Sequence, residues 1–165
     1  MDEGRAPRIL VAGIGNVFAT DDGFGSEVVR RLAGEPWPDG VRVVDYGIRG
    51  VHLAYDLLED WDALVLVDAV PARGAVGAVE VTDIGPDDVV GGPQLDAHGM
   101  DPATVLSGLT ALGGRLPPRT VLVGCQVAET GDGMGLTPAV AAAVQPARRA
   151  VRSLVTAGLA AEEVP

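Results

Sequence analysis

The sequence predicts one α/β domain, a three-layer α/β/α sandwich around a twisted, mostly parallel sheet of about five strands. Apolar runs alternate with helical patterns along the 165 residues, in the order β-α-β-α-β-β-α-β-α. Hydrophobic residues make up 47% of the chain and aromatic residues only 4%, so Val, Leu, Ile and Ala must form the core, as in a parallel sheet covered by helices. This length suits a single domain over residues 1–165, with loose tails at residues 1–7 and 157–165.

Five segments carry strand patterns. Residues 8–12 and 41–45 are short apolar runs, and the second run ends in an acid. Residues 63–67 form a continuous apolar run, which indicates the central buried strand. Residues 78–84 alternate between apolar and polar side chains, which favours a half-exposed strand nearer the edge of the sheet. The last predicted strand covers residues 120–124.

The first two helices follow the first two strands. A glycine-rich turn leads into a helix over residues 22–33, and Thr20, Asp21 and Asp22 are its candidate N-caps. The second helix, over residues 51–59, has apolar residues at helical spacing. These are Val51, Ala54, Tyr55 and Leu58.

Two further helices are marked by a capping residue followed by proline. They are expected over residues 101–112 and 137–154, and Thr137 caps the second of them. Pro146 lies inside this last helix, where it lacks an N–H group and crowds the preceding turn. We therefore expect it to kink the helix or divide it in two.

Three aspartates stand where predicted parallel strands end or turn. Asp22 begins the first helix, and Asp45 and Asp68 end or directly follow the second and third strands. Right-handed crossovers place the ends of parallel strands on one edge of the sheet, so these side chains are expected to meet there. A long loop over residues 85–100 carries His98 and is expected to cover that edge.

Two carboxylates and one imidazole from separate loops suit a borderline or transition-metal ion such as zinc or nickel. Asp68 closes a buried strand, and a buried carboxylate needs hydrogen bonds or a metal ion. Asp22 has an alternative role as a helix cap, and His98 as an ordinary exposed histidine. Arg49 lies in a glycine-flanked turn, where it either binds a substrate carboxylate or points into solvent.

Two alternative functions stay open from the residues alone. The first glycine-rich turn partly matches a dinucleotide-binding fingerprint, with Asp45 as the ribose-binding acid. However, Phe18 stands where that fingerprint needs its third glycine, and the adjacent aspartates would repel a pyrophosphate. Cys125 could be the nucleophile of a cysteine peptidase, although a buried structural thiol is the usual role of such a residue.

Charge and composition exclude several classes of partner. The formal net charge of −11 argues against nucleic-acid and anionic-membrane partners. The single cysteine rules out an intrachain disulfide, the first residues lack the apolar core of a signal peptide, and no run reaches transmembrane length. We therefore expect a monomeric cytoplasmic protein with no membrane partner.

Five blocks of the sequence together resemble the hydrogenase maturation proteases. They occur in the family's order and at family-like spacing, and they cover nearly the whole chain. The blocks are GIGN-x3-TDDGFG at residues 13–25, VVDYGIRG at 43–50, LVLVDAV at 64–70, DAHGM at 96–100 and GLTPAV at 135–140.

This resemblance implies an aspartyl-type endopeptidase that trims the C-terminus of a [NiFe]-hydrogenase large-subunit precursor already loaded with nickel. By motif position, Asp22, Asp68 and His98 correspond to the residues that bind a metal ion in the family and recognise the substrate's nickel. Asp22 and Asp68 are the expected catalytic residues. The nickel is supplied by the substrate, and a divalent ion such as nickel, zinc or cadmium can occupy the site. The expected substrate-binding residues are Asn16, Asp45 and Arg49.

Overall fold

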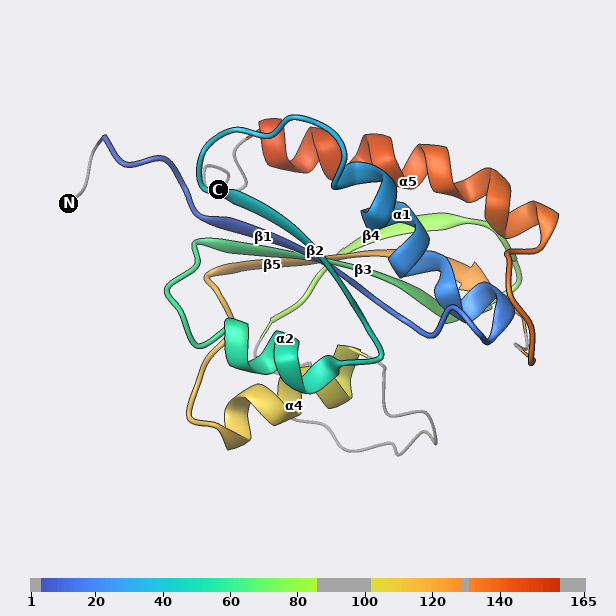
Figure 1. The fold of residues 1–165 in the computed structure, drawn as a ribbon, viewed down its shortest axis with the longest axis horizontal. Helices are drawn as coiled ribbons and strands as arrows, with labels where there is room; N and C mark the ends of the chain where they lie inside the picture. The colour runs from blue at the N-terminus through green and yellow to red at the C-terminus, as the bar shows by residue number, and fades with distance from the viewer. Residues whose placement is uncertain (1–3, 86–101, 129–130, 158–165) are drawn as a thin grey trace.

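The computed structural model describes residues 4–85, 102–128 and 131–157, which form a sheet between two layers of helices (Figure 1). This is the predicted fold class. The strands are β1 (Ile9–Ile14), β2 (Val41–Gly47), β3 (Ala63–Pro71), β4 (Val79–Asp83) and β5 (Arg119–Val127). The helices are the 3-10 turn η1 (Thr20–Gly23) and the α-helices α1 (Phe24–Leu32), α2 (Gly50–Asp56), α4 (Pro102–Ala111) and α5 (Pro138–Thr156).

The five strands form one sheet in the order β2-β1-β3-β5-β4. Strands β2, β1, β3 and β5 run parallel, and β4 pairs antiparallel with β5 at the edge. The half-exposed strand near the edge and the buried central strand are therefore both where the sequence patterns predicted them.

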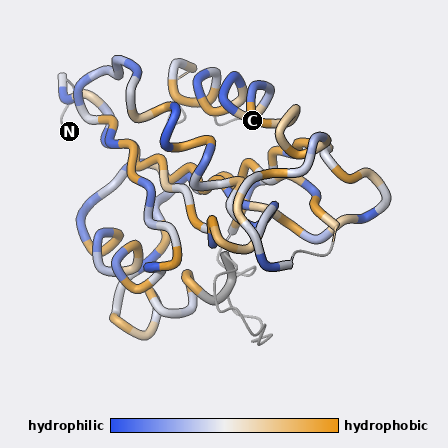
Figure 2. The backbone as a smooth tube through the Cα atoms, turned by 45° about the vertical axis from the view of Figure 1, so that its right-hand side comes forward, coloured by the Kyte–Doolittle hydropathy of each residue, from blue (hydrophilic) through white to orange (hydrophobic). Residues whose placement is uncertain are grey.

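Side chains from the two faces of the sheet form two separate apolar cores. Helices α1 and α5 cover one face, and α2 and α4 cover the other (Figure 1). Along β3, Val65 and Val67 point into the α1–α5 core, whereas Leu64 and Leu66 point into the α2–α4 core. The buried strands are mostly hydrophobic while α5 alternates along its length (Figure 2). None of the helices in the described ranges is long and apolar enough to cross a bilayer.

Several predicted boundaries and caps differ from the structure. Strand β3 extends to Pro71, so Asp68 lies within the strand rather than after it. Helix α5 runs from Pro138 to Thr156 without a break, so Pro146 does not divide it. The first helix begins as the 3-10 turn, and neither η1 nor α1 has a side-chain cap, so Asp22 is not a capping residue.

The predicted buried face of α2 was partly wrong. Leu53, Ala54 and Leu57 face the core. Val51 and Tyr55, at positions expected to pack, are 65% and 55% exposed. Helical spacing alone allowed either face, and the packing of α2 against β2 and α4 buries this one.

The glycines of the first turn let backbone pass unusually close to backbone. A Cβ atom on Gly25 would lie 2.2 Å from the carbonyl oxygen of Val67 and 2.5 Å from that of Ile14. A Cβ on Gly13 would lie 2.5 Å from the Gly25 carbonyl oxygen. Gly15 has a φ of 142°, and a Cβ there would lie 2.1 Å from the carbonyl oxygen of Asp22. The first turn of α1 therefore sits directly on the ends of β1 and β3.

We expect Gly25→Ala to lower the free energy of unfolding by roughly 1–3 kcal/mol, because the added methyl group overlaps two backbone carbonyls that have no flexible side chain to move. Gly108→Ala in α4 is the matched control, since a Cβ there meets nothing within 4 Å. Alanine should stabilise that helix by about 0.5–1 kcal/mol. Guanidinium denaturation of both variants checks this, and equal stability of the two would contradict the packing described.

Candidate active site

The carboxyl ends of the parallel strands bring two of the predicted site residues to one edge of the sheet. In register, Gly13 of β1 lies between Asp45 of β2 and Val67 of β3, and Asp68 is the next residue along β3. The 3-10 turn η1, which contains Asp22, follows β1 beyond this edge and packs against β3. Asp22 and Asp68 therefore lie at the same end of the sheet, as the order of elements predicted.

Asp22 is partly buried and fixed by the loop that precedes it. Its Oδ2 accepts a hydrogen bond from the backbone N–H of Asn16 at 3.0 Å. The Asn16 side chain in turn accepts a bond from the N–H of Phe18 at 2.9 Å, which shapes the turn. Oδ1 of Asp22 makes no hydrogen bond to the part of the chain that the structure describes, so this oxygen is available to a ligand.

Asp68 is 3% exposed, although it is a carboxylate in a strand. One oxygen, Oδ1, accepts a hydrogen bond from the N–H of Ala69 at 2.8 Å. The alternation along β3 directs Asp68 to the face that α2 and α4 cover, following Leu64 and Leu66. A buried carboxylate in a strand is costly without hydrogen bonds or a metal ion, and an aspartate after a continuous apolar run is the signal that singled out Asp68 in the sequence.

Asp45 and Arg49 make bonds within the protein that hold the turn after β2. Asp45 faces α1, where its Oδ1 accepts bonds from the Ser26 hydroxyl at 2.6 Å and from the Gly47 N–H at 3.0 Å. Arg30 lies 3.5 Å from the other oxygen. The Arg49 guanidinium donates to the backbone carbonyls of Tyr46 and Asp45. Asp45 therefore shares the sheet edge but points to the face opposite the one expected for Asp68.

The third predicted ligand, His98, and most of its loop over residues 85–100 lie outside the described residues. Within the described ranges, no three His, Cys, Asp or Glu side chains are grouped so as to hold a metal ion. Of the three predicted ligands, the structure therefore describes the two aspartates at the sheet edge.

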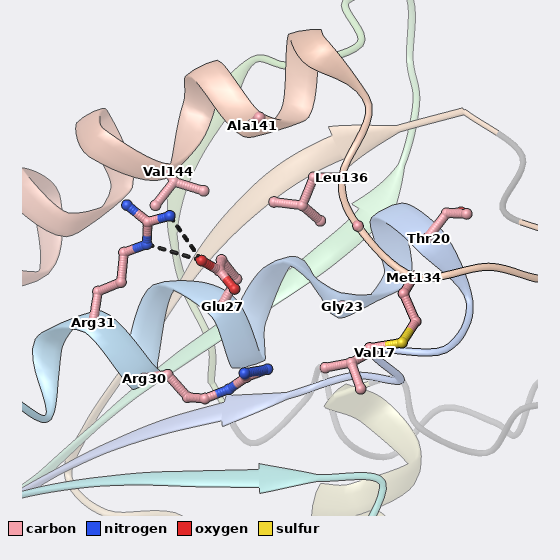
Figure 3. A pocket seen from close by; sticks show the side chains of 11 residues that line it. Val17, Thr20, Gly23, Glu27, Arg30, Arg31, Met134, Leu136, Ala141 and Val144 are labelled. Carbon is pink, nitrogen blue, oxygen red and sulfur yellow. Dashed lines mark hydrogen bonds and ion pairs between the residues drawn. The ribbon is translucent and has the colours of Figure 1, made fainter.

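Next to η1 the structure has a pocket of about 460 Å³ between α1 and α5 (Figure 3). Thr20 and Gly23, on either side of Asp22 in η1, line it, but neither Asp22 nor Asp68 does. Arg31 and Glu27 form an ion pair at 2.8 Å on its α1 side, and Met134 borders it from the loop before α5. The pocket is therefore a neighbour of the sheet-edge site and not the site itself.

Cys125 is fully buried in the α1–α5 core. Burial raises the pKa of its thiol to about 11, and the nearby Asp21 carboxylate adds to the shift. A buried thiol that stays protonated at neutral pH is a poor nucleophile. Burial of the thiol therefore argues against the cysteine-peptidase alternative and agrees with the buried structural thiol expected here. His52, the second histidine of the chain, is exposed on α2.

Comparison with known proteins identifies the family. A family model described as hydrogenase maturation protease matches residues 26–153. The hydrogenase expression/formation protein HupD of Rhodobacter capsulatus is 37% identical over 162 residues, which cover 94% of this chain and 75% of that protein. The chain belongs to the hydrogenase maturation protease family. It is therefore a peptide hydrolase, which favours the peptidase function over a nucleotide-binding module.

Further relatives agree with this assignment in sequence and in fold. The hydrogenase 2 maturation protease of Escherichia coli is 32% identical over 142 residues, which cover 85% of each chain. The structure of the hydrogenase maturating endopeptidase HybD from E. coli superposes with a TM-score of 0.76 at 31% identity, covering 92% of this chain and 94% of that one. HybD from Thermococcus kodakarensis gives a TM-score of 0.68 at 27% identity, over 89% and 98% of the two chains.

Asp21 is the functional candidate that sequence reasoning treated only as a helix cap. Its carboxylate is 4% exposed and accepts two hydrogen bonds from Thr137, one from the backbone N–H and one from the hydroxyl, both at 2.7 Å. Thr137 stands at the N-cap position of α5, as predicted, but its hydroxyl bonds to Asp21 and not to the helix. The sequence contains one signal for this pair: Asp21 lies in the first family-like block, residues 13–25, and Thr137 lies in the last, residues 135–140.

We expect the Cys125 thiol of the folded protein to resist alkylation at pH 8, where a thiol with a pKa of about 11 is deprotonated in about 0.1% of molecules. The rate with iodoacetamide should rise about tenfold per pH unit as the pH approaches that pKa. The same chain in guanidinium, with its thiol exposed, is the control and should react rapidly. Rapid alkylation of the folded protein at pH 8 would show that the thiol is accessible and ionised.

Proposed function

We propose that this protein is an endopeptidase that removes the C-terminal extension of a [NiFe]-hydrogenase large-subunit precursor after nickel has been inserted. Membership of the maturation protease family and the agreement in fold with HybD support this substrate. The observation that carries the proposal is the placement of Asp22 and Asp68, from separate elements, at one edge of the sheet. Asp22 offers an oxygen with no other partner in the described part of the chain, and Asp68 is a carboxylate held in a buried setting.

In this proposal the nickel belongs to the substrate. The precursor presents its bound nickel to Asp22, Asp68 and His98, whose oxygen and nitrogen donors suit that ion. Docking the ion there positions the adjacent peptide bond at the same edge of the sheet. Asn16, which holds Asp22 in place, and Asp45 and Arg49, which shape the turn after β2, are proposed to border the bound polypeptide.

Hydrolysis then needs a water molecule and a group that accepts its proton. We assign this general-base role to one of the two aspartates. The water oxygen bonds to the carbonyl carbon of the scissile peptide, the C–N bond breaks, and the proton passes to the departing amine. Because the ion that completes the site arrives with the precursor, cleavage reports that metal insertion is finished. The reaction takes place in the cytoplasm and needs one copy of the chain.

Asp22→Asn, Asp68→Asn and His98→Ala should each reduce cleavage of nickel-loaded precursor by at least 100-fold, because the asparagines replace a charged, basic oxygen donor with a neutral amide and the alanine removes the imidazole. Unfolding midpoints should change little for Asp22 and His98. Matched controls are Asp39→Asn and His52→Ala, which alter exposed residues of the same types. Cleavage is followed by the shift in precursor mass. If the three site variants cleave as fast as their controls, these residues are not the site.

Nickel-loaded precursor should be cut, whereas apo-precursor should be left intact, because only the loaded form brings the ion that Asp22, Asp68 and His98 are proposed to contact. The experiment presents both forms with and without a chelator, and a third arm adds the protease pre-incubated with zinc to apo-precursor. Equal cleavage of apo- and loaded precursor, or cleavage supported by zinc on the protease alone, would contradict recognition of the substrate's nickel.

A further inference from the structure

The turn that carries Asp22 is bound to the loop before α5 by a set of hydrogen bonds, which we call the clasp. It joins residues 18–21 to residues 131–137. Thr20 donates its N–H to the carbonyl of Gly133 at 2.8 Å, and Gly133 donates its N–H to the carbonyl of Phe18 at 2.9 Å. The Gly131 N–H donates to the Thr20 hydroxyl at 3.3 Å. The two bonds from Thr137 to the buried carboxylate of Asp21 complete the clasp.

We propose that Asp21 is a positioning residue for the peptidase reaction, holding η1 through Thr137 so that the neighbouring Asp22 faces the precursor. This inference rests on the proposed function of Asp22. Asp21 and Asp22 are consecutive residues of a four-residue 3-10 turn, so their side chains point in different directions. Asp21 points toward Thr137 and the core, and Asp22 points back to the N–H of Asn16.

Asp21 contributes a buried carboxylate to the clasp, and Thr137 supplies the donors that satisfy it. The carboxylate is 4% exposed, close enough to Cys125 to affect its thiol, and it contacts no cation among the described residues. Two short bonds from one residue therefore satisfy a buried acid, and bonds to a charged acceptor are stronger than neutral ones. A buried carboxylate without hydrogen bonds is costly, so Asp21 keeps its bonds to Thr137. The position of Thr137 therefore fixes the position of η1.

On the side of the preceding loop, η1 is held by the bond from the Asn16 N–H to Asp22 and by close backbone packing at two glycines. Gly15 lies against the carbonyl of Asp22, and Gly23 lies against Val17. These contacts define how close the turn approaches the sheet, and the clasp bonds attach it to the loop before α5 and to the N-cap of that helix. Movement of η1 by about 1 Å would misplace the Asp22 oxygen relative to the reacting groups, which can reduce a rate about 100-fold.

The test compares Thr137→Val, Thr137→Ser and Thr156→Val in the full chain, with Asp21→Ala as a second way to break the clasp. Valine at 137 removes the hydroxyl donor and keeps the backbone donor, whereas serine keeps both. Thr156→Val removes a hydroxyl that bonds only within α5, to the carbonyls of Arg152 and Ser153, and is the matched control. Readouts are kcat and KM for nickel-loaded precursor, the unfolding midpoint, and hydrogen exchange of the Ala19, Thr20 and Asp22 amides.

Thr137→Val should lower kcat about 10- to 100-fold with a smaller change in KM, and should speed amide exchange in η1. Thr137→Ser should keep wild-type kcat, and Thr156→Val, which removes only an exposed hydrogen bond, should lose less stability with kcat unchanged. Equal kcat in Thr137→Val and Thr156→Val, at a temperature where both are folded, would overturn the proposal. If the wild-type protein itself fails to cut the loaded precursor, the proposed function fails. The exchange measurement then still decides the positioning: unchanged exchange in Thr137→Val would overturn it.

Discussion

The structure depends on the close approach of the first turn of α1 to the ends of β1 and β3. Backbone meets backbone there because Gly13, Gly15 and Gly25 have no Cβ atoms, and each would clash with a carbonyl oxygen if it had one. This contact places the α1–α5 layer on the sheet and puts η1 at the carboxyl edge. The position of Asp22 relative to Asp68 is a consequence of that packing.

The two cores on either side of the sheet explain why the predicted site residues do not all converge. Strand alternation sends Asp45 toward α1 and directs Asp68 to the opposite face, although both lie near the same edge. Asp45 is used by Ser26 and Gly47, so its role in the structure is to hold the turn that leads into α2. Asp22 lies on η1, beyond the edge of the sheet, so strand alternation does not direct its side chain to either face.

Two acidic side chains of this protein, Asp21 and Glu35, are each satisfied by specific partners on or next to α5. With a net charge of −11, the chain must separate its carboxylates or satisfy them individually. Asp21 is satisfied by two Thr137 donors inside the core, and Glu35 by Arg148 and Arg152 between the end of α1 and α5. The hydrogen bonds from Arg148 and Arg152 lower the pKa of the Glu35 carboxyl, so this link stays charged in more acidic solution than a free glutamate would. Both acids therefore tie α5 to the first βα unit.

The sequence by itself determined the fold class, the central strand, the family and the shared edge of Asp22 and Asp68, because hydrophobic period, glycine position and strand order are local or topological properties. Only the tertiary structure decided which face of α2 is buried, that β3 continues through Asp68, and that Asp21 bonds to Thr137. Those outcomes depend on contacts between residues far apart in the chain, such as the 116 positions that separate Asp21 from Thr137. A carboxylate at a helix start has the same local pattern whether it caps that helix or binds a distant one, so the sequence left this choice to the packing.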